Sequence, residues 1–107
     1  MPVFLLVRTQ NGPEWDPAKP MEEQTLWQEH AEYMDALTDR GFFLLGGPSV
    51  YPRVPFAVRA DSEDQLRAEL AHDPWHESHL VIESIELWTI RVHSPLLGDG
   101  AHSPLQA

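Results

Sequence analysis

Apolar side chains follow two different periods along this chain of 107 residues, and each period predicts one kind of element. Runs that are apolar, or that alternate between apolar and polar side chains, predict β-strands at 3–9, 42–45, 54–60 and 80–92. Glycine, proline and asparagine bound these runs, as expected for turns. The proline-rich segment 10–24 is longer than a plain connector and is typical of a functional loop.

Apolar residues spaced three and four apart predict the first helix, which begins near Leu26. Thr25 and Gln28 have the spacing of a capping box, in which each side chain bonds a backbone amide of the first turn. Gly41 is expected to end the helix in a left-handed conformation. The predicted buried face consists of Leu26, His30, Tyr33, Met34 and Leu37.

A second capping box, formed by Ser62 and Gln65, begins a shorter helix whose buried edge carries two leucines four residues apart. After this helix, Asp73 suits an N-cap and Pro74 suits the first position of a helix. We therefore expect one further helical turn over residues 73–78.

The order strand, helix, strand, strand, helix, strand predicts the α+β class and a ferredoxin-like βαββαβ sandwich. Right-handed crossovers place both helices on one face of a four-stranded antiparallel sheet. Strands 3–9 and 80–92 are apolar on both faces, so the opposite face of the sheet also needs cover. We expect a homodimer in which two copies pack through that face.

Chain length and composition limit the number of domains. A chain of 107 residues with 42% hydrophobic side chains can bury one core but not two. Residues 1–92 are expected to form that domain. Residues 93–107 lose the periodic pattern and are expected to form a flexible C-terminal tail.

Charge and absent residue types exclude several functions. The chain carries 17 acidic and 7 basic side chains, and its formal net charge of -10 opposes binding to nucleic acid and to anionic membranes. The absence of cysteine excludes disulfides, thiolate nucleophiles and cysteine-based zinc sites. The first residues run directly into a strand, so we expect a cytoplasmic protein that does not span a membrane.

Two polar residues stand out as candidates for chemistry. His30 lies on the apolar face of the first helix, and an imidazole can serve as general acid or base near neutral pH. Asp73 could orient that imidazole from its capped turn. The alternative for His30 is a core histidine bonded to a backbone carbonyl, and the alternative for Asp73 is a purely structural N-cap.

Three further histidines, His72, His76 and His79, have spacings that could gather them around a metal ion. Pro74 interrupts the helical register there and no HExxH motif is present, so a solvated polar turn is the preferred interpretation. Gly46-Gly47 lacks the spacing of a nucleotide-binding loop. We therefore expect neither a metal nor a cofactor.

Several short motifs follow one another in an order that is known from one family. They are Phe4-Leu5-Leu6-Val7, Glu29-His30-Ala31-Glu32-Tyr33-Met34-Asp35-Ala36-Leu37, Leu44-Leu45-Gly46-Gly47-Pro48, Asp73-Pro74-Trp75 and Glu86-Leu87-Trp88-Thr89. With these motifs, the chain resembles the YciI-like (YCII-related) family over residues 2–92.

The resemblance implies a dimeric ferredoxin-like fold, the dimeric α/β barrel, in which His30 and Asp73 form a paired active site beside the dimer cleft. It also implies that Gly47 and Pro48 line the same pocket and that Trp75 forms an apolar wall. Relatives include chloromuconolactone dehalogenases of aromatic breakdown, and most members lack an assigned substrate.

Together these observations favour a small enzyme of lyase, dehalogenase or isomerase type. In it, His30 is oriented by Asp73 and moves a proton on a small carbonyl or lactone compound. The alternative is a non-catalytic module whose cleft binds a small ligand or a protein partner, with His30 as a satisfied polar group on the pocket floor.

Overall fold

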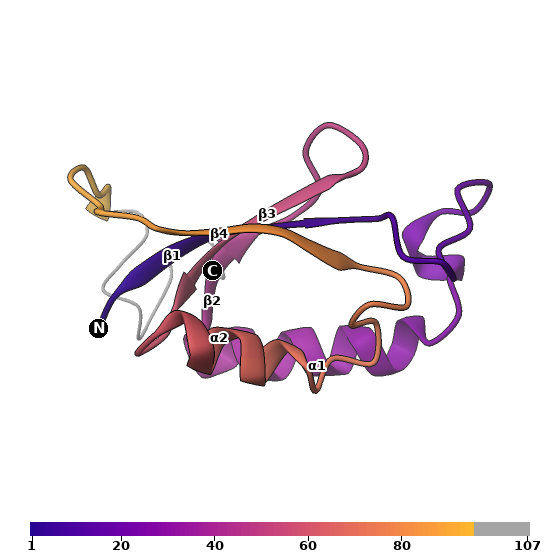
Figure 1. Cartoon of the computed structure of the whole chain (residues 1–107), viewed down its shortest axis with the longest axis horizontal. Coiled ribbons are helices and arrows are strands. Elements are labelled where there is room, and N and C mark those ends of the chain that lie inside the picture. Colours follow the sequence, from indigo (N-terminus) through magenta and orange to yellow (C-terminus); the bar gives the residue numbers. More distant parts are fainter. Residues whose placement is uncertain (96–107) are drawn as a thin grey trace.

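The computed structural model describes residues 1–95 of the chain. In them, one four-stranded antiparallel sheet packs against two α-helices, which lie on the same side of the sheet (Figure 1). This confirms the predicted α+β class and is compatible with a ferredoxin-like fold. The elements are β1 (Val3–Thr9), the 3-10 turn η1 (Met21–Glu23), α1 (Trp27–Asp39), β2 (Phe43–Gly46), β3 (Arg53–Arg59), α2 (Glu63–Leu70) and β4 (Val81–Leu87).

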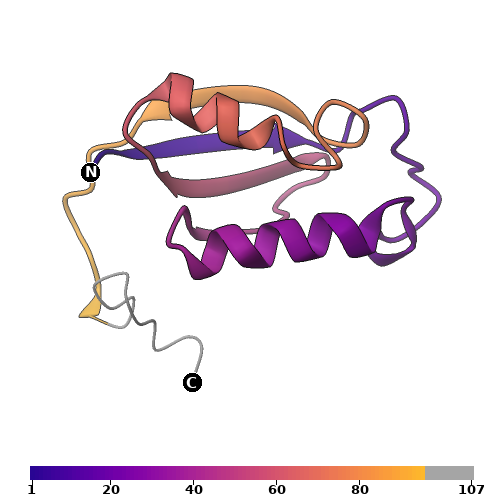
Figure 2. The same ribbon diagram turned by 90° about the horizontal axis from the view of Figure 1, so that it is seen from below.

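The strand order β2-β3-β1-β4 makes β1 a central strand. Its register places Leu6 beside Phe56 of β3 and Ile85 of β4. Arg8 follows Leu6 by two residues, so its side chain points to the same, helix-covered side of the sheet. Figure 2 shows that side, with α1 and α2 in front of the sheet and running roughly along its strands. An arginine therefore enters the layer between helices and sheet.

The core fills that layer, and one glycine sets a close approach within it. A Cβ atom on Gly46 would lie 2.2 Å from Cδ1 of Phe56, so only glycine lets the end of β2 pass this ring. Among residues 1–95, no helix is long and apolar enough to cross a membrane. The buried apolar cluster consists of Phe4, Leu6, Leu37, Phe42, Phe43, Val54, Phe56, Val58, Ala60, Leu66, Leu70, Trp75 and Leu80.

The first helix begins differently from its prediction. α1 starts at Trp27 with no side-chain cap, and its N-cap residue Leu26 has a left-handed φ of 63°. The predicted capping box is wrong because Thr25 makes tertiary contacts instead: its hydroxyl lies 2.8 Å from Nε2 of His79, and its carbonyl accepts a 2.7 Å hydrogen bond from Nε1 of Trp75. Leu26 is 45% exposed, and Trp27 packs against the core in its place.

The second helix agrees with its prediction at the N-terminus and not beyond its end. The Ser62 hydroxyl accepts a 3.1 Å hydrogen bond from the Gln65 amide, as predicted for this cap. The helical turn expected over 73–78 does not form. Asp73 Oδ1 instead accepts a 2.9 Å hydrogen bond from the Trp75 amide, which closes a tight turn across two residues.

The last strand, predicted over 80–92, is wrong at its C-terminal end because its partner strand runs out. β4 ends at Leu87, and the Trp88 amide makes the final ladder bond to β1 at 2.9 Å. β1 begins at Val3, and the carbonyl of the preceding Pro2 points to the β3 side, where it accepts from the Ala60 amide. Strands β2 and β3 shift by one residue from 42–45 and 54–60.

The sheet face away from the helices is less apolar than predicted. The ladder shifts register after Val7, which changes the β4 side chains that face outwards. Leu5 and Val7 pair there with Glu86 and Ser84. The prediction that β4 is apolar on both faces is therefore wrong.

The predicted domain over 1–92 and the predicted tail over 93–107 are only partly covered by the described residues. Residues 96–107 of the predicted tail lie outside the described residues. The assignment of residues 1–92 as one domain stays a prediction.

Candidate active site

The fold brings the two candidate residues into direct contact. His30 lies near the start of α1, and Asp73 lies in the turn that follows α2. His30 Nδ1 is 2.8 Å from Asp73 Oδ1, and both residues are buried. His30 therefore bonds the Asp73 carboxylate and not a backbone carbonyl, and Asp73 bonds the His30 imidazole in addition to closing its turn.

Asp73 has a second charged partner that sequence reasoning did not assign to the site. Arg8 Nη1 donates to Asp73 Oδ2 at 2.8 Å, and neither side chain is exposed. Arg8 Nε and Nη2 are also buried and have no hydrogen-bond partner among the described residues. The sequence signal was a charged residue at an inward-facing position of an otherwise apolar strand.

These contacts keep Asp73 ionised. Burial by itself would raise the pKa of this carboxyl group. The hydrogen bond from His30, the nearby Arg8 guanidinium and the Trp75 amide outweigh burial and hold the Asp73 pKa below its ordinary value of 3.8. At neutral pH the site therefore contains a carboxylate that accepts hydrogen bonds only.

The ionised carboxylate fixes the proton position on His30. Because Asp73 can only accept, the neutral imidazole carries its proton on Nδ1 and leaves the lone pair on Nε2. Within residues 1–95, Nε2 makes no hydrogen bond and is not among the fully enclosed side-chain atoms that lack a partner. In this tautomer an unprotonated nitrogen faces away from Asp73 and keeps a small accessible surface.

Trp75 holds the imidazole in place from the side. Its fully buried indole stacks on His30 with a centroid distance of 4.0 Å and an interplanar angle of 9°. On the same indole, His79 stacks at 4.9 Å and 12°. Trp15 and Trp27 contact the indole with centroid distances of 5.6 and 5.7 Å. Trp15 and Trp27 extend this aromatic cluster. The role of Trp75 as an apolar wall of a substrate pocket stays a prediction.

His79 is a structural member of this cluster. Its Nε2 lies 2.8 Å from the Thr25 hydroxyl and its Nδ1 lies 2.7 Å from the Ser78 hydroxyl. Burial is the main cause that lowers the pKa of His79, and the nearby His30 lowers it further, whereas the charges of Glu14 and Asp73 act in the opposite direction. The neutral imidazole is therefore the stable form.

The histidines at 72, 76 and 79 do not gather around a common point. In the described part of the chain, no three histidine, aspartate or glutamate side chains are placed to hold one metal ion. His72 is exposed and His76 lies 3.4 Å from the carboxylate of Glu77. The turn they occupy is polar at its surface and aromatic inside.

Tyr33, one turn after His30, joins the two helices beside the dyad. Its hydroxyl donates to the Glu69 carbonyl and also lies 3.2 Å from the Glu69 carboxylate. Burial is the first cause that raises the pKa of Tyr33, followed by the charge of Glu69. The phenol therefore stays protonated and serves to position α1 against α2.

The two pocket residues expected from the resemblance lie at the end of β2. Gly47 donates its amide to the Pro55 carbonyl at 3.1 Å, and Pro48 is exposed. Hydrogen bonds and ring contacts within residues 1–95 link neither residue to His30 or Asp73. Their role as substrate-binding residues stays a prediction.

Comparisons of the chain with protein families, curated proteins and solved structures find no match. The description of the site therefore depends on its own geometry.

Proposed function

We propose that the chain is a small enzyme related to the YciI-like family that uses His30 and Asp73 for general acid/base chemistry. The reaction type is that of a lyase, dehalogenase or isomerase, and the substrate is a small carbonyl or lactone compound. One observation carries the proposal. The ionised Asp73 carboxylate lies 2.8 Å from His30 Nδ1 in a buried contact, which orients the imidazole and leaves its Nε2 without a hydrogen-bond partner among the described residues.

The proposed chemistry is a proton transfer at a carbon next to a carbonyl. His30 Nε2 takes the proton, and the imidazolium that forms is stabilised by Asp73 at Nδ1. A base positioned in this way typically accelerates a reaction by about 10²- to 10⁴-fold. Trp75 keeps the ring from rotating out of line, because the stacked indole covers one face of the imidazole.

We also propose the homodimer as the working form and a ferredoxin-like topology for each copy. Leu5 of β1 is half-buried on the sheet face away from the helices, beside Val7 and Ala57, which are already buried within one chain. Leu45 of β2 lies on the same face and is 49% exposed. Light scattering at micromolar concentration is expected to give the mass of a dimer, and the mass of a single chain would refute this part.

Deuterium incorporation tests the catalytic part without knowledge of the natural substrate. A panel of five-membered lactones is incubated with the protein in heavy water, and exchange at the carbon next to the carbonyl is followed by proton NMR. We expect exchange that falls by about 10²-fold or more in His30→Gln and in Asp73→Asn. His72→Gln replaces an exposed histidine of the same region and is the matched control.

An equal exchange rate in the wild-type protein and in His30→Gln would refute the catalytic proposal. The non-catalytic alternative is favoured by the burial of His30, which is 5% exposed. It predicts a different result: a lactone shifts the His30 signals on binding, but no member of the panel exchanges faster than in buffer.

A further inference from the structure

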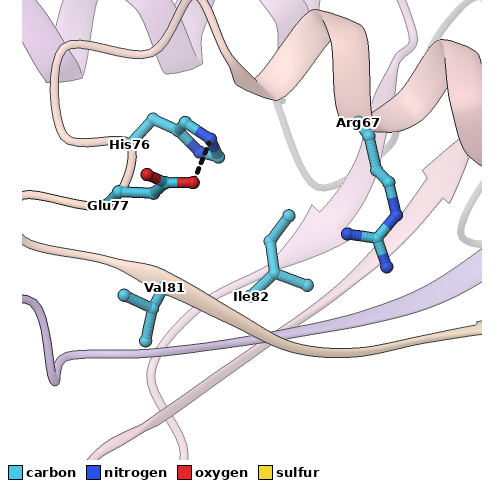
Figure 3. Close-up of a pocket in the computed structure, with 5 residues that line it drawn as sticks. All are labelled: Arg67, His76, Glu77, Val81 and Ile82. Atoms are coloured by element: carbon cyan, nitrogen blue, oxygen red, sulfur yellow. Dashed lines mark ion pairs between the residues drawn. The ribbon is translucent and has the colours of Figure 1, made fainter.

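A separate pocket lies on the other side of the turn that carries Asp73. Its volume is about 480 Å³, within the range of sites for small organic ligands. Figure 3 shows that α2, the turn after it and β4 each contribute to its wall. The lining residues are Arg67, His76, Glu77, Val81 and Ile82.

The polar part of the wall contains a cation with free donors. Arg67 bonds Glu63 through Nε alone, at 2.9 Å, and its side chain is half exposed. Nη1 and Nη2 make no hydrogen bond within residues 1–95. These two terminal nitrogens form the fork that pairs with a carboxylate.

A second polar group of the wall also lacks a partner. His76 Nδ1 is buried and unpaired among the described residues, while Nε2 faces the carboxylate of Glu77. An unpaired buried nitrogen is unfavourable, and the ring that carries it lines the pocket with its accessible part. Glu77 itself is 78% exposed, which leaves its charge well solvated.

The remaining wall is apolar. Val81 and Ile82 follow one another at the start of β4 and are half-buried. Ile82 pairs with Arg8, faces the helix layer and also packs against the main core, whereas Val81 pairs with Thr9 and its side chain faces the other way. Figure 3 shows Arg67 reaching from α2 towards the strand that carries them. A ligand of this pocket therefore needs an anionic end and a small apolar body.

We propose that this pocket binds a small organic acid, with its carboxylate on Arg67 and its apolar body against Ile82. The inference does not depend on the proposed catalytic function, because no side chain of the pocket bonds His30 or Asp73 within residues 1–95. The two sites share only the turn, in which the His76 amide donates to the Asp73 carbonyl at 2.9 Å.

Three probes separate the parts of this proposal. Phenylacetate has both features, phenylacetamide has the same shape without the charge, and acetate has the charge without the ring. Titration calorimetry up to about 10 mM ligand is expected to detect phenylacetate and to show weaker binding of both analogues. The ring signals of His76 in the NMR spectrum are expected to shift on addition of phenylacetate.

Two arginine variants give a matched pair. Arg67→Gln removes the proposed anchor and is expected to weaken phenylacetate binding about tenfold. Arg53→Gln removes the same charge from an arginine of β3 that is 51% exposed and pairs with Glu83 at 3.2 Å. Both sites are half exposed, so both variants are expected to keep the fold, as circular dichroism can check.

Specific outcomes overturn the inference. If phenylacetate gives neither heat in the titration nor shifts of the His76 signals, the wild-type protein has no such binding site and the inference is wrong. An equal loss of phenylacetate affinity in Arg67→Gln and Arg53→Gln also contradicts the inference, because binding would then depend on the net charge of the protein and not on Arg67. Shifts confined to His30 would place the acid at the dyad and reject this pocket, whatever the dyad does.

Discussion

Arg8 and Asp73 form an ion pair that is completely enclosed, with 2.8 Å between Nη1 and Oδ2 and no exposed side-chain surface on either partner. The arginine comes from the central strand and the aspartate from the turn after α2, so the pair ties the sheet to the helix layer. Each charge depends on the other, because an isolated buried charge is strongly unfavourable.

Removal of one member of this pair is expected to cost more than removal of both. Arg8→Met keeps an unbranched apolar stem and removes the charge, which leaves Asp73 with His30 as its one basic partner. It is expected to lower the free energy of unfolding by about 3–5 kcal/mol. The double variant Arg8→Met/Asp73→Asn buries no unpaired charge and is expected to recover part of that loss. Urea unfolding followed by tryptophan fluorescence measures the free energy of unfolding of the wild-type protein, of Arg8→Met, of Asp73→Asn and of the double variant.

The double-mutant cycle decides the outcome. Simple addition of the two single losses would mean that the residues do not interact energetically, and it would contradict the role assigned to the pair. Arg40→Met is the matched control, because Arg40 pairs with Glu69 at 3.0 Å but is 62% exposed. Its loss is expected to stay below about 1 kcal/mol.

The pairing of His30 with Asp73 could be anticipated because the order of elements and the resemblance noted in the sequence both bring the two residues together. A histidine on an apolar face and an aspartate before a proline were both visible, and the order of elements brought their helices together. Arg8 was missed because a charge at the end of a strand usually points to solvent. Only the register with β3 and β4 shows that this position lies under the helices.

The failed predictions have a common physical cause. Thr25 has the spacing of a cap, but a buried tryptophan and a buried histidine compete for its polar groups, and these tertiary bonds determine its conformation. The end of β4 has strand-like residues but no remaining partner on β1. A local sequence pattern shows which element a segment can form. Whether that element forms depends on the hydrogen-bond partners that the rest of the fold offers to the segment.

The burial of His79 predicts a pH dependence of stability. Its pKa is lowered in the folded state, so the unfolded chain binds more protons as the pH falls below the ordinary value of 6.5. This component of stability is therefore present at pH 7 and above and is lost on acidification, by up to about 1.4 kcal/mol per pH unit. Urea unfolding at several pH values between about 7 and 5 measures the slope.

Two histidine variants isolate that slope. His79→Gln is expected to flatten it, even though the variant is less stable at every pH because it loses the stack on Trp75. His72→Gln alters an exposed histidine of the same turn region and is expected to keep the slope. A slope unchanged in His79→Gln would show that another group causes the pH dependence.

The loop before η1 is held against the turn that contains Ser78 and His79 by a contact that admits only glycine. A Cβ atom on Gly12 would lie 2.3 Å from the Ser78 carbonyl oxygen, and the Gly12 amide donates to the His79 carbonyl at 3.1 Å. Gly12→Ala must therefore push the loop away, and with it Trp15, whose ring contacts Trp75 edge-on. We expect a loss of about 1–3 kcal/mol in unfolding free energy and a changed tryptophan emission of the folded protein. Asn11→Ala, at the exposed neighbouring position, is expected to change neither value. An emission spectrum of Gly12→Ala equal to that of the wild-type protein would show that Trp15 keeps its place without this contact.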